Sequence, residues 1–313
     1  MLVSLEEIAP LLRSPVTGGP LTRCETSLVD EADTSTRFSF VGHAPVLVDF
    51  SRSIFSQEAL LANQAESQVR RPRFDGLRSQ VKRLLSPPKK ITSENVQEFI
   101  RLLLRDNDRP VVLVVGGGTI GQGMAPLYEH PTIRVVALDV YASPLAQLVA
   151  DAHQIPLADA SVDGVVVQAV LEHVLEPQVV VDEIWRVLRP GGIAYAETPF
   201  LQHVHEGAYD FLRFTASGHR WLFRRFEAIR TGVCGGAGTQ MLWSIDYFVR
   251  GLFRSVAAGK VAKLSFFWLA AFDPLIPAAY ASDAASGFYL MGRKSETGLT
   301  PQQMPAVYHG AQG

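Results

Sequence analysis

A glycine cluster directly after an apolar run is the stretch of this chain best suited to bind a ligand. Residues 111–123 read VVLVVGGGTIGQG, and the first five, mostly β-branched, predict a buried strand. The glycines let the backbone turn tightly and let a ligand approach without a Cβ in the way. Asp139 ends a second apolar run 21 residues after Gly118. At that spacing an acidic side chain meets ribose hydroxyls in dinucleotide-type folds, so the pattern predicts an adenosine-containing cofactor.

Two later segments narrow the choice of cofactor. Residues 151–174, DAHQIPLADASVDGVVVQAVLEHV, begin with an acid and contain a strand opened by Asp163. Residues 183–200, EIWRVLRPGGIAYAETPF, predict an amphipathic helix that ends at a Pro and a Gly pair, followed by a strand. Together with the glycine cluster, these segments resemble the class I S-adenosylmethionine-dependent methyltransferases. The resemblance covers roughly residues 92–295.

The resemblance implies contacts between the cofactor and particular residues. The glycine loop would pass the methionine part of S-adenosylmethionine, Asp139 would bind the ribose hydroxyls, and Asp151 would face the adenine amino group. Carboxylates accept hydrogen bonds from a diol and from an exocyclic amine, which suits these roles. The expected cofactor-binding residues are Gly116, Gly117, Gly118, Asp139, Val140, Asp151, Ala152 and Gln168.

The glycine motif departs from the family pattern at two positions. The family usually has an acid two residues before the first glycine, which holds the cofactor's ammonium, and this chain has Val114 there. Ile120 replaces the closing glycine of the motif, and Gly121 follows it. Three alternatives follow from these departures. The chain binds the cofactor more weakly, another group holds the cofactor's ammonium, or the chain is a non-catalytic copy of the fold.

A polar loop after the predicted fifth strand could carry the chemistry. Residues 198–215, TPFLQHVHEGAYDFLRFT, lie where ligands bind in such sheets. A histidine titrates near neutral pH and is a natural general base for a hydroxyl, so we expect His205 to act as the base, with Glu206 or Asp210 fixing its tautomer. The catalytic candidates are His205, Glu206, Asp210 and His173, the substrate-binding candidates are His203, Tyr209 and Arg213, and no metal site is expected.

Some of these candidate residues could have a purely structural role instead. Asp210 and Arg213 could pair only to hold the loop together, and the pair Glu172-His173 could orient the cofactor loop without a catalytic role. The loop and the segment ASGFYLMGRK also resemble a bacterial subgroup of these methyltransferases that modifies small molecules or glycans.

The order of elements predicts an α/β fold. Strands and helices alternate from residue 111 on, which favours a parallel, Rossmann-like methyltransferase sheet with helices on both faces, plus a small N-terminal β-rich domain. Strands are expected near 111–115, 134–139, 163–169, 192–198, 226–233 and 286–293. Helices are expected at 91–106, with Thr92 or Ser93 as cap, and near 121–129, 177–188 and 216–223, and a loop is expected between Asp139 and Asp151.

Four regions are predicted along the chain. Residues 1–55 resemble a zinc-ribbon-like domain, but Ser14 and Thr17 stand where its C-x-x-C motif would be, and Cys24 alone cannot complete a tetrahedral site. Residues 56–90 form a basic linker, with docking of an anionic substrate or surface as the alternative. The methyltransferase domain is expected at 91–295 and a tail at 296–313.

Composition limits the compartment and the partners. The net charge of −2 gives no global reason to expect nucleic-acid binding, and two distant cysteines favour a reducing cytoplasm. The N-terminus lacks the basic region of a signal peptide. Residues 264–281 are strongly apolar and predict a buried or subunit-interface helix, with membrane contact as the alternative and a homodimer as a possible assembly. Core packing, or lining of an acceptor site, is expected for Phe266, Phe267, Trp268, Phe272 and Tyr280.

The leading hypothesis is a methyltransferase that uses S-adenosylmethionine to methylate an oxygen of a small metabolite, sugar or glycan. A NAD-dependent oxidoreductase would share the glycine motif and Asp139 but would not explain LEHV or RVLRPGG. A scaffold or binding protein on a decayed methyltransferase fold would fit Val114.

Overall fold

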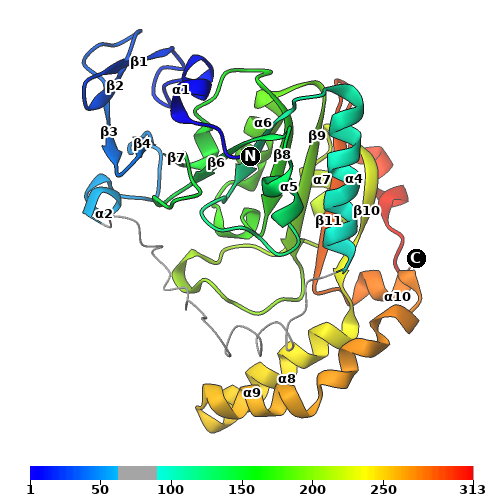
Figure 1. Cartoon of the computed structure of the whole chain (residues 1–313). Coiled ribbons are helices and arrows are strands. Elements are labelled where there is room, and N and C mark those ends of the chain that lie inside the picture. The colour runs from blue at the N-terminus through cyan, green and yellow to red at the C-terminus, as the bar shows by residue number, and fades with distance from the viewer. Residues whose placement is uncertain (63–89, 313) are drawn as a thin grey trace.

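The computed structural model describes residues 1–62 and 90–312, and the predicted basic residues at positions 70–89 lie outside them. The described residues form an eleven-stranded sheet in the order β1-β2-β3-β4-β7-β6-β5-β8-β9-β11-β10 (Figure 1). The strands are β1 (Leu21–Cys24), β2 (Ser27–Asp30), β3 (Arg37–Val41), β4 (Ala44–Leu47), β5 (Val111–Val115), β6 (Arg134–Asp139), β7 (Leu148–Ala150), β8 (Val162–Gln168), β9 (Leu188–Pro199), β10 (Phe226–Gly235) and β11 (Gly287–Lys294).

The centre of the sheet is parallel, as the sequence predicts. β5 pairs in parallel with β6 and β8, and β8 pairs in parallel with β9. All five residues of β5 are buried, because a parallel strand is covered on both faces. β11 runs antiparallel to β9, and β10 runs antiparallel to β11. The carboxyl ends of β5, β6, β8 and β9 therefore lie at one edge of the sheet.

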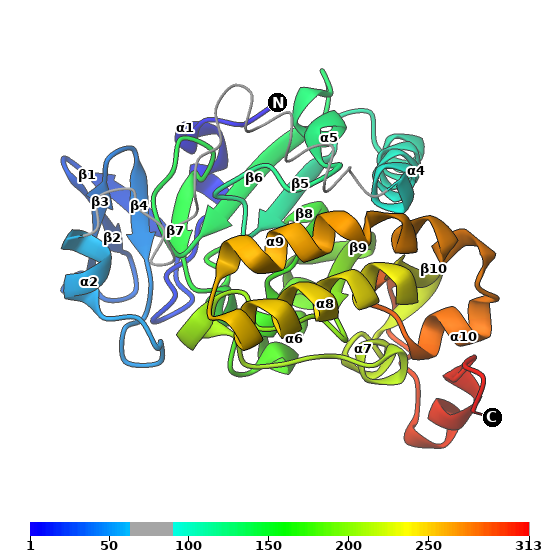
Figure 2. The same ribbon diagram turned by 90° about the horizontal axis from the view of Figure 1, so that it is seen from below.

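Helices cover both faces of the sheet, which confirms the predicted fold class. α4 and α5 lie on one face, and α6 and α7 on the other (Figure 2). The helices are α1 (Leu5–Ile8), α2 (Gln57–Ala62), α4 (Lys90–Asp106), α5 (Ala125–Glu129), α6 (Pro177–Val187), α7 (Ala216–Leu222), α8 (Ala237–Phe253), α9 (Val256–Ser265) and α10 (Ala278–Asp283). The 3₁₀ turns are Ala9–Leu11, Ala152–Gln154, Leu171–His173, Gly207–Tyr209, Phe267–Leu275 and Pro301–Val307.

Three details of the predicted elements are wrong. The region between Asp139 and Asp151 holds a short strand, β7, because three residues suffice once they pair with β6 and β4. The helix expected from residue 121 begins at Ala125, since Gly123 has a φ of +76° and belongs to a turn. Thr92 and Ser93 do not cap α4, which is already helical at Lys90.

The N-terminal strands β1 to β4 form an antiparallel ladder that joins the main sheet through parallel pairing of β4 with β7. In the turn before β1, the Thr17 hydroxyl donates a 2.6 Å hydrogen bond to the buried Asp30, and the Ser14 hydroxyl accepts from the Thr17 amide at 3.3 Å. Hydrogen bonds thus hold the turn at the place where a zinc ribbon would carry its metal cysteines. The likeness to a zinc ribbon and the division into four regions stay predictions.

The apolar segment 264–281 is exposed in the single chain, so its predicted burial in the core is wrong, whereas the predicted subunit contact stays a prediction. Phe267 is 68% and Leu275 75% exposed, and the segment forms a 3₁₀ turn followed by α10 instead of one helix. The physical reason is visible in Figure 1, where α8 and α9 lie side by side beneath the sheet and carry this segment away from the core. Phe266, Phe267, Trp268, Phe272 and Tyr280 are likewise exposed. Within residues 1–62 and 90–312, no helix is both long enough and apolar enough to cross a bilayer.

Candidate cofactor and acceptor site

A cavity of about 830 Å³ lies at the carboxyl edge of the parallel strands. In α/β sheets of this kind ligands bind at that edge, and the volume is typical of small-molecule sites. Its walls include Ile54 and Phe55, which follow the N-terminal ladder and were not among the expected site residues. The expected site residues that line it are Gly116, Asp139, Val140, Asp151, Ala152, Gln168, His173, His205, Glu206 and Tyr209. Five other expected residues are not part of the lining: Gly117, Gly118, His203, Asp210 and Arg213.

The glycine turn after β5 requires glycine at its first two positions. Gly116 has a φ of +76°, and a Cβ there would collide with the Val170 side chain. A Cβ on Gly117 would lie 2.6 Å from the Cβ of Ala137. Both backbone amides donate to the Leu138 carbonyl oxygen, at 3.0 and 2.9 Å. The turn is therefore fixed against the end of β6, with its backbone at the cavity wall.

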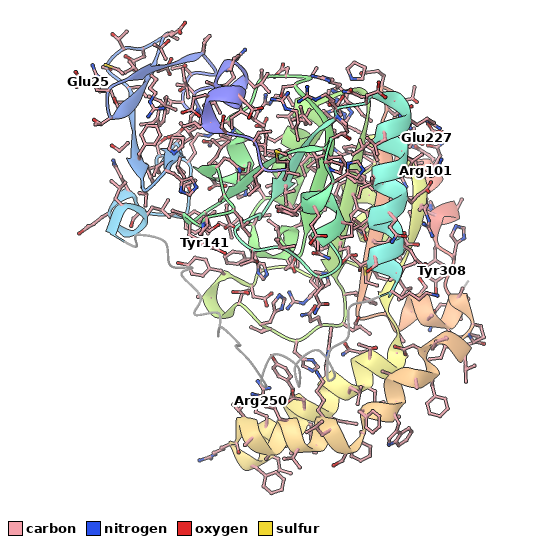
Figure 3. The ribbon with its side chains drawn as sticks, in the orientation of Figure 1. Glu25, Arg101, Tyr141, Glu227, Arg250 and Tyr308 are labelled. Carbon is pink, nitrogen blue, oxygen red and sulfur yellow. The ribbon has the colours of Figure 1, made fainter. Side chains whose placement is uncertain are left out.

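Asp139 lies at the end of β6, next to this turn. One carboxylate oxygen accepts a 2.8 Å hydrogen bond from the Gly118 amide, and the other accepts one of 2.7 Å from the Val140 amide. Each carboxylate oxygen has more than one acceptor position, which suits the binding of a ligand's hydroxyls. Tyr141, two residues further on, lies at the same edge of the sheet (Figure 3).

Asp151 is buried at the end of β7 and is held by three donors. Its carboxylate accepts from the Ser53 hydroxyl at 2.5 Å, from the His153 amide at 3.0 Å, and from His153 Nδ1 at 2.6 Å. Burial alone would raise the pKa of Asp151, but the hydrogen bonds from His153 and Ser53 outweigh it and lower the pKa. The carboxylate therefore stays ionised and fixed in place. Beside it, the Phe55 ring stacks on Tyr209 with centroids 6.1 Å apart.

Glu197 on β9 is a buried carboxylate that the sequence reasoning missed. It lines the cavity and accepts hydrogen bonds from the Thr92 hydroxyl at 2.7 Å, the Tyr195 hydroxyl at 2.5 Å and the Gln168 amide at 2.9 Å. Thr92 thus donates to this carboxylate from inside α4. The signal was present in the sequence, since an acid in the run AYAETPF stands at the end of an otherwise apolar strand.

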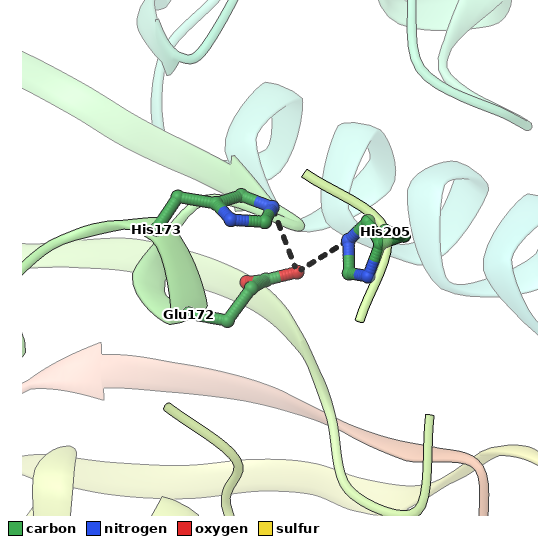
Figure 4. A group of neighbouring side chains, drawn as sticks. All are labelled: Glu172, His173 and His205. Atoms are coloured by element: carbon green, nitrogen blue, oxygen red, sulfur yellow. Dashed lines mark ion pairs between the residues drawn. The ribbon is translucent and has the colours of Figure 1, made fainter. Parts of the chain in front are cut away.

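Glu172, His173 and His205 meet at the far side of the cavity (Figure 4). Glu172 Oε1 lies 3.6 Å from His173 Nε2 and 3.8 Å from His205 Nε2. The two imidazole rings are arranged edge to face, with centroids 4.9 Å apart. Burial raises the pKa of Glu172 to about 8 and lowers the pKa of His173.

The loop that carries His205 is held by Asp210 and Arg213. Asp210 accepts a 2.8 Å hydrogen bond from the His205 amide and pairs with the Arg213 guanidinium, which also donates to the Gln202 carbonyl at 2.8 Å. Burial opposes the ionisation of Asp210, but the bonds from Arg213 and the His205 amide lower its pKa well below the usual range. His203 stacks on Tyr247 of α8, with centroids 4.4 Å apart. The expected catalytic and substrate-binding roles of these loop residues stay predictions.

The fold, the cavity and its two carboxylates together define a class of protein. The chain is an α/β protein with a nucleoside-sized cavity at a glycine turn, and two fixed carboxylates, Asp139 and Asp151, lie at the ends of neighbouring strands. Gly116 and Val170 both line the cavity, and a Cβ on Gly116 would displace Val170. The acids match the hydroxyl and amine donors of an adenosine. The residues present fit such a cofactor.

Comparison with known proteins gives a family match for the central part of the chain. Residues 113–196 match the family model described as a methyltransferase domain. A probable S-adenosylmethionine-dependent methyltransferase of Mycolicibacterium smegmatis is 41% identical over 70 residues, which are 22% of this chain and 24% of that protein. The chain therefore matches about a quarter of the length of this curated relative.

Solved structures that align with this chain include the following two. One is a S-adenosylmethionine-dependent methyltransferase from Archaeoglobus fulgidus, with a TM-score of 0.43 and 10% identity over 70% of this chain and 100% of that one. The other is phosphoethanolamine N-methyltransferase 2 from Haemonchus contortus, with a TM-score of 0.41 and 14% identity over 71% of this chain and 61% of that one.

Residues 113–196 form a methyltransferase domain of the class I, S-adenosylmethionine-dependent kind. S-adenosylmethionine is accordingly the cofactor of this domain.

Proposed function

We propose that this protein is a methyltransferase that uses S-adenosylmethionine to methylate an oxygen of a small metabolite or sugar. One observation carries the proposal. A single cavity reaches from Asp139 and Asp151, on the side expected to hold the nucleoside, to the Glu172, His173 and His205 cluster. A cofactor and an acceptor can therefore lie side by side in it, which is what a direct displacement requires.

The cofactor-side residues have separate tasks in this proposal. Asp139 binds the ribose hydroxyls, Asp151 binds the adenine amino group, and the Ala152 amide donates to the ring. The bound cofactor supplies a methyl group on a positively charged sulfur. Because the carboxylates are already held by backbone amides and by Ser53 and His153, they need no rearrangement when the cofactor binds.

Glu197 takes the place of the acid that Val114 replaces, in our proposal. Val114 pairs with Val166, and Val166 pairs with Tyr195, so these three side chains form a row on one face of the sheet. Glu197 is two residues beyond Tyr195 and therefore on the same face, at the carboxyl edge. Its carboxylate is the group that we expect to pair with the cofactor's ammonium.

The acceptor's hydroxyl lies at the Glu172, His173 and His205 cluster in this proposal. His205, the expected general base, lines the cavity, and Asp210 holds its backbone amide. Histidine and carboxylate groups can bind a hydroxyl and help to remove its proton, which favours oxygen as the methylated atom.

The test is a product screen with the full chain and a donor whose methyl group is isotopically labelled. Candidate metabolites and sugars are incubated with both, and mass spectrometry detects the labelled methyl group. The proposal expects an O-methylated product that disappears with Asp139→Ala. A labelled product methylated only at nitrogen or carbon would overturn the choice of oxygen.

A second candidate function rests on Val114. A binding protein on a decayed methyltransferase fold would lack the acid at this position and would transfer nothing. This candidate predicts that the chain binds the donor weakly or not at all, and that no candidate acceptor yields a labelled product.

A further inference from the structure

Among residues 1–62 and 90–312, one group of histidine and acidic side chains has the spacing of a metal site. Glu172, His173 and His205 each offer one ligand atom, and the three atoms lie within 4.8 Å of one another. The distances of 3.6 and 3.8 Å from Glu172 Oε1 to the two Nε2 atoms are too long for hydrogen bonds. They approach the separation of about 3.0–3.4 Å between ligands that share one cation at bond lengths near 2.1 Å.

The hydrogen bonds of both histidines leave the Nε2 atom of each ring available to bind a cation. His173 Nδ1 lies 2.8 Å from the Tyr209 carbonyl oxygen, and His205 Nδ1 lies 3.2 Å from the His203 carbonyl oxygen. Carbonyl oxygens only accept, so each Nδ1 carries the proton and each Nε2 keeps its lone pair. Metal-binding histidines are held in the same way, with the second ring nitrogen donating to a carbonyl or a carboxylate.

Glu172 supplies a second, independent observation. Its side chain is fully buried, and within the described residues neither of its carboxylate oxygens accepts a hydrogen bond. A buried carboxyl group without a partner is costly, and such groups are usually paired or bound to a metal. Figure 4 shows the carboxylate directed between the two imidazole rings.

We propose that Glu172 and the Nε2 atoms of His173 and His205 bind one divalent transition-metal cation at the cavity wall. Two imidazoles and one carboxylate suit Zn²⁺, Co²⁺ or Mn²⁺, and three protein ligands leave at least one position open. His173 and His205 line the cavity, so the open position faces the space of the acceptor. The role of the cation rests on the proposed function. The cation holds the acceptor's oxygen, and His205 is then a metal ligand instead of a free base.

The experiment uses the full chain without an affinity tag, freed of metal by a chelator that is then removed. Calorimetric titration with Zn²⁺, and absorption spectroscopy with Co²⁺, should each give one equivalent bound per chain. Glu172→Gln and His205→Asn should weaken binding at least tenfold, because each removes one ligand. The matched controls Glu227→Gln and His309→Ala replace exposed residues outside the cluster. Both variants should bind the metal ions as the parent chain does.

Each outcome decides the proposal. Loss of binding in both ligand variants, with the controls unchanged, supports it. Absence of stoichiometric binding by the parent, or binding that survives in both ligand variants, overturns it. Circular dichroism and binding of S-adenosylhomocysteine show that the variants are folded, and if Glu172→Gln does not fold, His205→Asn on the loop decides. A chain that binds the cation but no nucleoside contradicts the proposed function instead.

Discussion

The Ser53 hydroxyl donates a 2.5 Å hydrogen bond to the buried carboxylate of Asp151. This bond ties the segment after the N-terminal ladder to the residue expected to face the adenine. Phe55, two residues later, also lines the cavity. The N-terminal part of the chain is therefore a wall of the candidate site as well as an extension of the sheet.

Ser53→Ala should weaken donor binding several-fold. The variant removes one of three donors that hold Asp151, so the carboxylate gains freedom that the ligand must then restrict. Calorimetry with S-adenosylhomocysteine measures the effect. Ser51→Ala is the matched control, since Ser51 is exposed and its amide and hydroxyl donate to Asp49 instead of Asp151. Equal affinities of the two variants would show that Ser53 plays no part in the site.

Glu197→Gln should weaken the binding of ligands that carry the ammonium group. The change keeps the shape of the side chain and removes its charge. The loss of a charge-assisted hydrogen bond costs about 1.5–3 kcal/mol, or about 10- to 150-fold in affinity. S-adenosylhomocysteine should show this loss, whereas 5′-methylthioadenosine, which has no ammonium, should bind as before.

The two ligands separate a specific role from general damage to the cavity. If Glu197→Gln lowered the affinity for both equally, Glu197 would be a structural carboxylate and the ammonium would need another partner. Glu227→Gln, on the exposed side of β10, is the control for the substitution itself.

Gly116→Ala should destabilise the fold and impair the cofactor side of the cavity. A φ of +76° costs an L-residue about 1–2 kcal/mol, and the added Cβ would also collide with Val170. Urea unfolding should show a loss of at least this size. Gly251→Ala in α8, where a Cβ would meet open space, should be neutral or stabilising. Equal stability of Gly116→Ala and the parent would mean that the turn adopts another conformation.

His219 should make the fold less stable in mild acid. It is buried in α7, and burial together with the nearby Arg220 charge lowers its pKa to about 3, against about 6.5 in an unfolded chain. Between these values the unfolded state binds more protons, so the stability is complete above about pH 6.5 and falls with pH, by at most about 1.4 kcal/mol per unit.

Urea unfolding of the parent and of His219→Leu, at several pH values between about 5 and 7.5, measures this contribution. Whatever the absolute stability of the variant, its stability should depend less steeply on pH than that of the parent. Identical slopes would show that His219 is not the neutral, buried group described here.

The sequence predicted the parts of the site that depend on local pattern. Apolar runs with a regular spacing place β5, β6 and β8, and Asp139 and Gln168 then follow at the ends of strands. The glycine turn was also predictable from the sequence, because only glycine tolerates the φ of Gly116 and the closeness of Ala137 to Gly117.

Features that depend on distant contacts were not predicted. Ser53 and Phe55 reach the cavity only because β4 pairs with β7. The partners of Glu197 come from α4, β8 and β9, so its role depends on the sheet register and on helix packing. The apolar segment 264–281 was predicted to be buried and is exposed. Its composition alone does not show whether other elements lie close enough to cover it.

The most direct test of the central claim is calorimetric titration of the full chain with S-adenosylhomocysteine, repeated with Asp139→Ala and with the exposed-acid control Asp108→Ala. The account predicts one ligand per chain, an affinity at least tenfold weaker in Asp139→Ala, and no change in Asp108→Ala. Absence of binding to the folded parent chain, or an affinity unaffected by loss of Asp139, would contradict the account.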